Sequence, residues 1–327
     1  MNSWYSVQIN YLLFLQHLRE ITGGVFDNFF LGITHLGEID YSYAVIAGIY
    51  WCISTQAGTF IFLNTGVSLF ISDLLKNIAC IYRPWILDSR IHPVPQAIKM
   101  AGGYSFPSGH TQNAVSIWGS LAYLSKNKIF SAILIILILL ISFSRNYLGV
   151  HTPQDVLASL IFTTIVVFLT PKFLKWVDNG KNRDIIVFIT AILAVVACMI
   201  FEHYKSYPMD YLNGELLVNP VNMRLSTAPK LGTFTGIFTG WLINRRFIHY
   251  DGSYGNILQK LLRFIPGVIV IYCLYYNGTG FLANFMHQKY AMLISTFFIM
   301  LFVTVIYPLI ILAVRKYILK LFCKRIN

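Results

Sequence analysis

Long apolar runs separated by short polar segments dominate this sequence. A helix that crosses a hydrocarbon core of ~30 Å needs about 20 predominantly apolar residues, and only helices and closed barrels satisfy their backbone inside lipid. We expect nine membrane spans, at residues 40–55, 58–77, 108–125, 129–146, 153–176, 184–202, 230–247, 260–279 and 289–318. The pattern therefore predicts an all-α integral membrane protein that crosses the bilayer many times.

The N-terminal region has a different pattern. Residues 4–36 mix Leu, Phe and Ile with polar neighbours such as Gln16 and Asp27. We expect two short amphipathic helices, split at Gly23 and Gly24, that lie in the membrane interface. The start of the chain lacks the basic segment and the cleavage site of a signal peptide, so we expect no removable leader.

A polar linker, "DNGKNRD" at residues 178–184, divides the remainder. We therefore expect three segments: interfacial helices at 1–39, a core at 40–178 and a C-terminal transmembrane extension at 179–327. The seventh span carries small residues at every fourth position, which permits close helix packing. These residues are Gly232, Gly236 and Gly240.

Composition agrees with a membrane protein. Of the 327 residues, 56% are hydrophobic and only 12% are charged, against about 25% charged in soluble domains. The net charge of +12 comes from short clusters between spans, not from a basic patch interleaved with aromatics, so we expect no nucleic-acid partner. The five cysteines lie far apart without metal-type or redox-type spacing, so we expect no disulfide framework.

The basic clusters also predict the orientation. Lys126 and Lys128 join the third and fourth spans, and further Lys and Arg residues follow the fifth and seventh spans and the last one. Short basic loops lie on the cytoplasmic side. The C-terminus is then cytoplasmic, and the loop from Cys80 to Phe106 lies on the non-cytoplasmic side.

Three segments carry polar groups that the bilayer would penalise without partners. Their key residues are Lys76, Arg83 and Pro84; Ser108, Gly109 and His110; and Ser144, Arg145, His151 and Asp155. The predicted topology places all three segments at the same membrane face, where they can converge. Three cations, two histidines and one carboxylate would then form a pocket for a multiply charged anion.

Each residue type has a role that follows from phosphate chemistry. Lys76, Arg83 and Arg145 can bind nonbridging oxygens and offset transition-state charge. Ser108 and the Gly109 amide lie where a helix begins, so unpaired N–H groups face the anion.

Two histidines can divide the reaction between attack and proton transfer near neutral pH. Asp155 stands four residues after His151 and can hold the far nitrogen of its imidazole. We therefore expect His151 to be the nucleophile and His110 the general acid, and we expect no cofactor.

These spacings resemble those of a known family. Lys-x6-Arg-Pro, Pro-Ser-Gly-His and Ser-Arg-x5-His-x3-Asp occur in this order, and together they resemble the signatures of the type 2 phosphatidic acid phosphatase superfamily, in its membrane lipid phosphatase branch. The resemblance covers about residues 40–176. It implies a metal-independent phosphatase with a helical-bundle core, a phosphohistidine intermediate and an active site at the outer interface. By motif position it implies that His151 is the nucleophile, Asp155 its partner, His110 the acid, and Lys76, Arg83, Ser108, Gly109 and Arg145 the phosphate cradle.

The predicted function is hydrolysis of a lipid phosphate, monoester or diphosphate, at the outer membrane face, with membrane lipids around it. Two alternatives stay open: transfer of a phosphoryl group from a lipid diphosphate to another acceptor, and a transporter or lipid-binding protein that uses the about four additional C-terminal spans. Neither the lipid tail nor the oligomeric state follows from the sequence.

Single residues also have simpler interpretations. Lys76 alone could be a lysine that reaches to the membrane surface from a span end. Asp155 could cap the fifth span, a role compatible with catalysis. The loop at residues 202–229 could lie over the pocket and select substrates, or be a plain connection.

Overall fold

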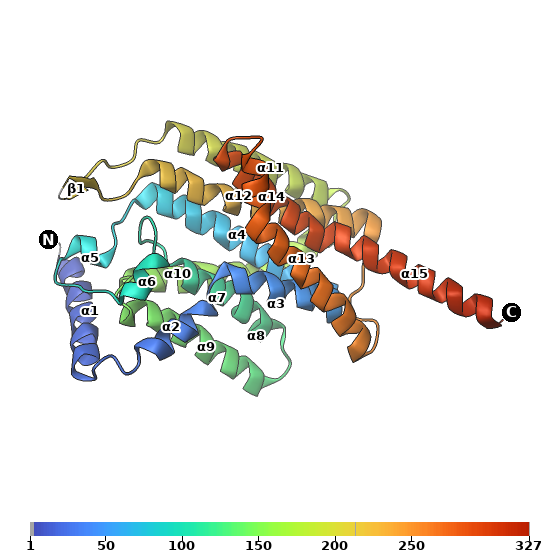
Figure 1. The fold of residues 1–327 in the computed structure, drawn as a ribbon, viewed down its shortest axis with the longest axis horizontal. Coiled ribbons are helices and arrows are strands. Elements are labelled where there is room, and N and C mark those ends of the chain that lie inside the picture. The colour runs from blue at the N-terminus through green and yellow to red at the C-terminus, as the bar shows by residue number, and fades with distance from the viewer. Residues whose placement is uncertain (1–2, 213, 327) are drawn as a thin grey trace. The chain divides into compact units, whose positions relative to one another are not determined.

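The computed structural model describes residues 3–212 and 214–326, which are mainly helical (Figure 1). The first half contains α1 (Ser3–Ile21), α2 (Asp27–His35), α3 (Ile39–Cys52), α4 (Thr55–Ala79), α5 (Pro84–Leu87), α6 (Pro95–Lys99), α7 (Gly109–Ala114), the π-helix η1 (Val115–Gly119), α8 (Ser120–Leu124), α9 (Lys128–Tyr147) and α10 (Pro153–Asp178). The second half contains α11 (Arg183–Tyr204), β1 (Tyr211–Leu212), β2 (Glu215–Leu216), α12 (Pro220–Ile243), the π-helix η2 (Asn244–Ile248), α13 (Ile257–Ala283), α14 (Gln288–Leu301), the π-helix η3 (Phe302–Ile306) and α15 (Tyr307–Ile326). The strands β1 and β2 pair antiparallel as a short hairpin.

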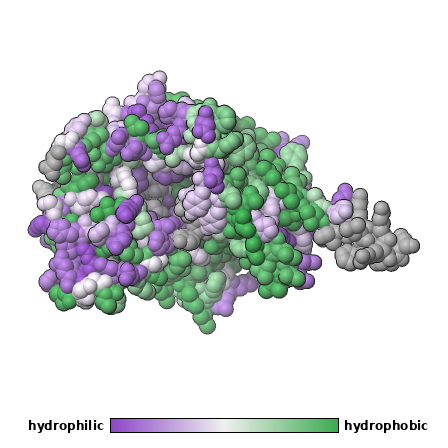
Figure 2. All heavy atoms as spheres, in the orientation of Figure 1, coloured by the Kyte–Doolittle hydropathy of each residue, from purple (hydrophilic) through white to green (hydrophobic). Residues whose placement is uncertain are grey.

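The all-α membrane architecture predicted from the apolar runs is confirmed. Among the described residues, six helical segments are long and apolar enough to cross a membrane. They are Thr55–Leu87, Lys128–Tyr147, Pro153–Asp178, Arg183–Tyr204, Ile257–Ala283 and Gln288–Tyr317. Much of the face shown in Figure 2 is covered by hydrophobic residues, and hydrophilic ones gather over α1.

The other three predicted spans are helical but are not among these six. Helix α3 has only 14 residues. The helix at 109–124, formed by α7, η1 and α8, carries buried polar side chains such as Gln112 and Asn113. Helix α12 begins at Pro220, ten residues before the predicted span, and contains Pro229. Helix α3 and the helix at 109–124 are short for a span, and polar residues such as Arg224 and Lys230 interrupt the apolar run of α12.

Contacts divide the chain into two compact units. Unit 1 comprises Met1–Ser42, Val67–Leu174 and Ala197–Thr227, and unit 2 comprises Tyr43–Gly66, Lys175–Val196 and Ala228–Asn327. The sequence segments 1–39, 40–178 and 179–327 stay a prediction about organisation along the chain.

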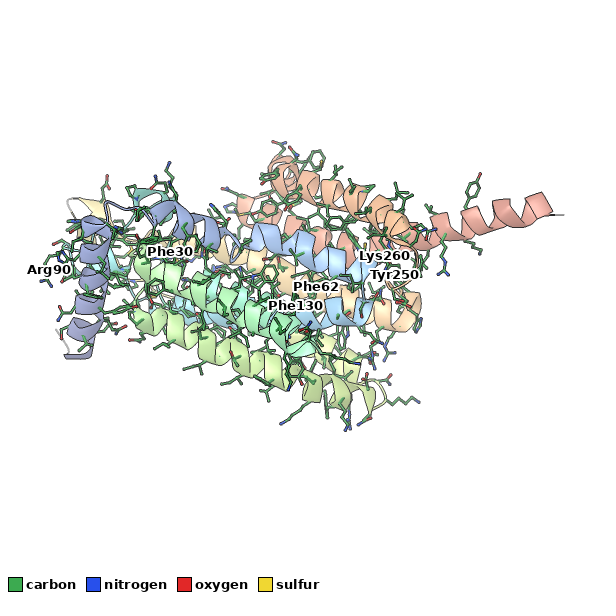
Figure 3. The ribbon with its side chains drawn as sticks, turned by 90° about the horizontal axis from the view of Figure 1, so that it is seen from below. Phe30, Phe62, Arg90, Phe130, Tyr250 and Lys260 are labelled. Carbon is green, nitrogen blue, oxygen red and sulfur yellow. The ribbon has the colours of Figure 1, made fainter. Side chains whose placement is uncertain are left out.

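In unit 1 the two N-terminal helices separate where the sequence predicts. Gly23 and Gly24 have φ of +58° and +70°, a backbone region that glycine adopts without strain. Helix α2 then packs on α9, and Phe30, labelled in Figure 3, lies against Tyr147 with ring centroids 4.4 Å apart. Helix α1 contributes Ile9 and Leu12 to a cluster with Ile91.

In unit 2 the predicted glycine face of α12 packs against α14 and η3. A Cβ atom on Gly232 would lie 2.0 Å from the backbone oxygen of Leu293, and one on Gly240 would lie 1.8 Å from Oγ1 of Thr304. Thr296 also donates a 2.9 Å hydrogen bond to the carbonyl of Pro229. The small-residue spacing therefore serves close helix packing, as predicted.

Polar contacts fix other parts of unit 2. Trp51 Nε1 donates a 2.8 Å hydrogen bond to the carbonyl of Val303. Arg246 binds both carboxylate oxygens of Asp184, at 2.7 and 2.6 Å. Cys52 and Cys273, on α3 and α13, carry free thiols.

Candidate active site

The three polar segments predicted from the sequence all belong to unit 1. Lys76 lies in the last turn of α4, and Arg83 directly precedes α5. Ser108 is the N-cap of α7, and Arg145 lies in the last turn of α9. Their convergence follows from how the short connections fold.

The connection between α9 and α10 positions His151. Helix α9 ends at Tyr147, and Gly149 adopts φ +75°, which reverses the chain. The amides of Val150 and His151 both donate to the carbonyl of Arg145, at 3.1 and 3.3 Å. Helix α10 then starts at Pro153, the first-turn position that proline favours. This tight turn places the imidazole beside the end of α9.

His151 lies between a guanidinium and a carboxylate. Its Nε2 is 2.9 Å from Nη1 of Arg83, and its Nδ1 is 3.4 Å from Oδ2 of Asp155. Because arginine has no acceptor, Nε2 must accept through its lone pair, and the proton belongs on Nδ1, facing Asp155. The ring therefore presents an unprotonated Nε2 on the side of the arginines.

The imidazole of His151 is neutral at physiological pH. Burial, followed by the charges of Arg83 and Arg145, lowers its pKa well below the ordinary value of histidine. A neutral imidazole is the nucleophilic form.

Asp155 is held by two further donors. Ser105 Oγ donates a 2.5 Å hydrogen bond to Oδ2 of Asp155, and the Thr152 amide donates one of 2.8 Å to the same oxygen. The Thr152 contact is the capping arrangement expected at the start of α10. Sequence reasoning missed Ser105, although it lies only three residues before Ser108.

Arg83 is buried and tied to the backbone around it. Its guanidinium donates to the carbonyls of Gly103, Val150 and Gly102 at 3.1, 3.0 and 2.9 Å. These bonds fix the plane of the group, and one Nη1 hydrogen is directed at His151.

Arg145 is fully buried and incompletely paired. Nη1 donates a 2.6 Å hydrogen bond to Oγ1 of Thr34 in α2, a residue that sequence reasoning missed. Among the described residues, Nε and Nη2 have no hydrogen-bond partner. A buried guanidinium with two orphaned donors is costly unless an anion binds there.

Lys76 lies against the loop that leads into α7. Its Nζ donates to the carbonyls of Tyr104, Ser105 and Pro107 at 2.7, 3.4 and 3.2 Å. The lysine thus connects the end of α4 to the segment that carries Ser108. A lysine that only extended to the membrane surface would not need these three hydrogen bonds.

The start of α7 leaves space for a ligand. No atom of the described residues lies within 4 Å of the position that a Cβ on Gly109 would occupy. The backbone of Ser108 is fixed on its other side, because its amide donates to the carbonyl of Asp155 at 3.1 Å and its own carbonyl accepts from Ser159 at 2.9 Å. The helix start is therefore anchored to α10 and open at Gly109.

His110 faces a second carboxylate. Its Nε2 is 3.9 Å from Oε1 of Glu38, which lies in the turn after α2. This nitrogen is buried and has no hydrogen-bond partner in the part of the chain that the structure describes. Glu38 was not predicted, because nothing in its own neighbourhood marks it.

The segment before α12 packs beside the loop at Tyr104. Tyr207 stacks on Tyr104 with centroids 6.5 Å apart, and its hydroxyl donates a 2.8 Å hydrogen bond to Oδ1 of Asn77. A Cβ on Gly103 would lie 2.6 Å from Sδ of Met223. The 202–229 region thus packs beside the residues that hold Arg83 and Lys76, and a role in substrate selection stays a prediction.

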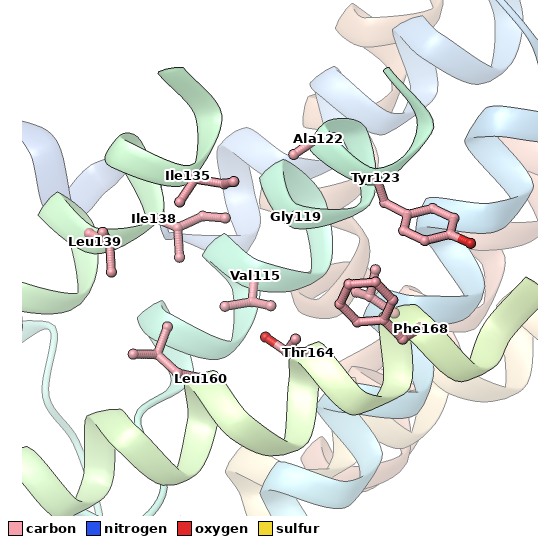
Figure 4. Close-up of a pocket in the computed structure, with 11 residues that line it drawn as sticks. Val115, Gly119, Ala122, Tyr123, Ile135, Ile138, Leu139, Leu160, Thr164 and Phe168 are labelled. Atoms are coloured by element: carbon pink, nitrogen blue, oxygen red, sulfur yellow. The ribbon is translucent and has the colours of Figure 1, made fainter. Parts of the chain in front are cut away.

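An apolar cavity of about 390 Å³ lies between η1, α8, α9 and α10 (Figure 4). Val115 and Gly119 line it from the helix that begins at Gly109, Ile138 from α9, and Leu160 and Phe168 from α10. Val115 follows His110 by five residues on one continuous helix. The cavity has room for hydrocarbon.

Within the described ranges, no three His, Cys, Asp or Glu side chains gather as a metal site would require.

Family comparison gives matches to both halves of the chain. Residues 57–179 match the PAP2 superfamily, and residues 229–317 match the transmembrane extension of PAP2 superfamily phosphatases. The first match contains all eight predicted site residues. No solved structure matches the chain.

Three curated relatives are phosphatases of lipid phosphates by name. Phosphatidylglycerophosphatase B of Bacillus subtilis is 31% identical over 165 residues, which cover 46% of this chain and 77% of the relative. Undecaprenyl-diphosphatase BcrC of the same organism is 34% identical over 152 residues, which cover 46% of this chain and 75% of the relative. Lipid phosphate phosphatase delta of Arabidopsis thaliana is 24% identical over 178 residues, which cover 51% of this chain and 41% of the relative.

Proposed function

Because the chain belongs to the PAP2 superfamily, we propose that it hydrolyses a lipid phosphate, monoester or diphosphate, without a metal and through a phosphohistidine. The observation that carries the proposal is an unprotonated His151 Nε2, 2.9 Å from Nη1 of Arg83, together with the buried guanidinium of Arg145, whose charge also acts on His151 and whose Nε and Nη2 lack hydrogen-bond partners among the described residues. A nucleophile near a guanidinium with N–H donors left over suits a phosphate better than a neutral substrate, because the phosphate oxygens can accept those hydrogen bonds.

The cradle residues bind the phosphoryl group. Arg145 offers Nε and Nη2, and Arg83 exchanges its bond to His151 Nε2 for one to a phosphate oxygen. That exchange frees the lone pair of Nε2 for attack. The amides at the open start of α7 complete the cradle, and charge that builds up on the equatorial oxygens is offset by the guanidiniums.

In the first step Nε2 of His151 attacks phosphorus, and the bond from phosphorus to the lipid oxygen breaks. His110 donates a proton to that oxygen, which leaves as an alcohol or as a lipid monophosphate. Asp155 accepts the Nδ1–H of His151 and stabilises the positive charge that develops on the ring.

In the second step water attacks the phosphohistidine. His110, now neutral, removes a proton from the water, and the bond between phosphorus and Nε2 breaks. Inorganic phosphate leaves, and both histidines return to their initial protonation states. The chemistry balances within the residues of the site.

The lipid class is supported by the apolar cavity and the membrane spans. The helix that starts at Gly109 continues to Val115 and Gly119, which line the cavity (Figure 4). A phosphate bound at the helix start would thus have hydrocarbon-lined space further along the same helix. We assign that space to the hydrocarbon chain of the substrate.

We also propose that the site opens on the non-cytoplasmic side and that the C-terminus is cytoplasmic, on the basis of the basic clusters between spans. Separate fusions of alkaline phosphatase and of a fluorescent protein to the C-terminus test on which side of the membrane the C-terminus lies. Fluorescence without alkaline phosphatase activity is expected, and the reverse would contradict it.

The direct test is release of inorganic phosphate from a panel of lipid mono- and diphosphates by purified protein in detergent, with a chelator present. Release that survives chelation and is lost in His151→Ala supports the proposal. Full activity in that variant would refute the mechanism. A folded protein that transfers label from a lipid diphosphate to an alcohol without phosphate release would be a phosphotransferase instead.

A further inference from the structure

The turn after α2 presents one carboxylate to two histidines. Oε1 of Glu38 lies 3.9 Å from Nε2 of His110 and 3.0 Å from Nδ1 of His35. The side chains become progressively more exposed along this row, from 14% for His110 through 22% for Glu38 to 44% for His35. The row runs from the site toward the surface of unit 1.

This turn is fixed against the helix that carries His110. Trp118 Nε1 donates a 3.0 Å hydrogen bond to the carbonyl of Leu36, and Asn113 donates one of 3.2 Å to the carbonyl of Gly37. A Cβ on Gly37 would lie 2.9 Å from the backbone oxygen of His110. Only glycine allows this close approach, so the carboxylate beside it is placed by the fold.

The charges around His110 call for an anion. Burial opposes protonation of this imidazole most strongly, the charges of Arg145 from α9 and Arg83 from the connection before α5 oppose it further, and Glu38 favours it. A general acid must carry a proton, and a second cation beside two guanidiniums is disfavoured. Glu38 supplies the opposite charge, and no hydrogen bond from another residue of the described ranges reaches Nε2 of His110.

Glu38 itself is ionised. Burial acts to raise its pKa, but His110 and His35 outweigh burial, and the pKa of the carboxyl lies below its ordinary value. The hydrogen bond to His35 occupies the same oxygen that faces His110, so His35 helps to orient the carboxylate.

We propose that Glu38 is the positioning residue of the general acid, a carboxylate that holds Nε2 of His110 and stabilises its protonated ring, with His35 orienting Glu38. The inference deepens the proposed function and rests on it. Glu38 lies outside residues 57–179, the part of the chain that matches the PAP2 superfamily. The site would then contain two carboxylate–histidine pairs, Asp155 with His151 for attack and Glu38 with His110 for proton transfer.

The test varies the leaving group. Loss of acid catalysis slows departure of a poorly acidic alcohol more than departure of 4-nitrophenol, which needs little protonation. For Glu38→Gln we expect kcat on an alkyl phosphate to fall by about 10- to 100-fold, and kcat on 4-nitrophenyl phosphate to fall by less than about 3-fold. KM should change little for either. Activity on 4-nitrophenyl phosphate also reports that the variant is folded.

The matched control is Glu20→Gln. Glu20 lies on the surface near the end of α1 and accepts a 3.0 Å hydrogen bond from Gln16. Its substitution should leave both rates unchanged. His151→Ala should lose both rates. His35→Gln should reproduce the pattern of Glu38→Gln to a smaller degree.

Three outcomes overturn the proposal. Equal losses on both substrates for Glu38→Gln would show a merely structural role, and no loss on either would show no role. Absence of wild-type activity on every phosphate ester would refute the proposed function itself, and with it this role for Glu38.

Discussion

Ser105 donates a 2.5 Å hydrogen bond to Oδ2 of Asp155, the same oxygen that faces Nδ1 of His151 at 3.4 Å. Ser105 is fully buried, and its own amide is tied to the carbonyl of Ile81 at 2.7 Å. The serine thus connects the chain after α4 to the carboxylate at the start of α10. It keeps Asp155 oriented toward the histidine.

Ser105→Ala should therefore lower kcat by about 10- to 100-fold, as the loss of an outer partner of a catalytic group commonly does, with little change in KM. Steady-state kinetics on a lipid phosphate measure both. Ser116→Ala is the matched control, because Ser116 is equally buried and its hydroxyl donates locally to the carbonyl of Asn113. Equal activity of the two variants would show that Ser105 does not support Asp155.

The sequence predicts those parts of the site whose spacing is local. Arg145, His151 and Asp155 fall within one turn and the helix ends beside it, so their order in the chain nearly dictates their proximity. Ser105 is 50 positions from its partner, and Thr34 is 111 positions from Arg145. Tertiary packing alone brings these pairs together, so no motif could identify them.

The same distinction holds for the fold. Apolar runs predict the long lipid-facing helices well. The apolar pattern predicts a span that starts only at residue 230, because Pro229 and its polar neighbours interrupt the pattern before it. The helix instead begins at Pro220, where Asn219 accepts a 2.8 Å hydrogen bond from the amide of Val221.

Arg145→Lys should lower kcat/KM by about 100-fold or more, because a lysine cannot present the two donors that the guanidinium directs into the site. Orthovanadate, a phosphate analogue, should raise the unfolding temperature of the wild-type protein but not of the variant. Arg90→Lys is the control, since Arg90 is exposed and pairs with Asp88 at 2.7 Å. Unchanged kinetics in Arg145→Lys would remove this residue from the phosphate cradle.

The pH dependence of kcat/KM should report the state of His151. Burial and the neighbouring guanidiniums lower the pKa of His151, so its nucleophilic form persists as the pH falls below about 6.5, the usual histidine value. Protonation at still lower pH removes the lone pair, so activity should fall on the acid side only there. Titration of the substrate by phosphorus NMR in the same detergent separates its ionisation from that of the enzyme. An enzyme pKa at or above 6.5 on the acid limb would contradict this assignment.

Gly119→Leu should alter selectivity for chain length. Gly119 lines the apolar cavity, and the first atom of a side chain there would meet Val115 at 3.4 Å and Ile138 at 3.7 Å, which are ordinary contacts. A leucine therefore fits at its base but fills space that we assign to the substrate chain. Activity on long-chain lipid phosphates should fall while activity on 4-nitrophenyl phosphate is kept.

Gly32→Leu is the control for the cavity variant, because Gly32 is exposed in α2 with nothing within 4 Å of a Cβ. The same chain-length profile in wild type and Gly119→Leu would place the hydrocarbon elsewhere.

Gly232→Ala should destabilise the C-terminal helices of unit 2. Its Cβ would lie 2.0 Å from the backbone oxygen of Leu293, an atom that can move only if α12 and α14 separate. Forcing an extra methyl into such a contact costs about 1–3 kcal/mol, and the apparent unfolding temperature in detergent should fall by several degrees at a fixed scan rate. Gly280→Ala is the matched control, because Gly280 lies in α13 with nothing within 4 Å of a Cβ. Alanine also favours a helix there by about 1 kcal/mol, so this variant should unfold at the wild-type temperature or above it. Equal unfolding temperatures for the two variants would show that the small-residue spacing of α12 does not serve close packing at Gly232.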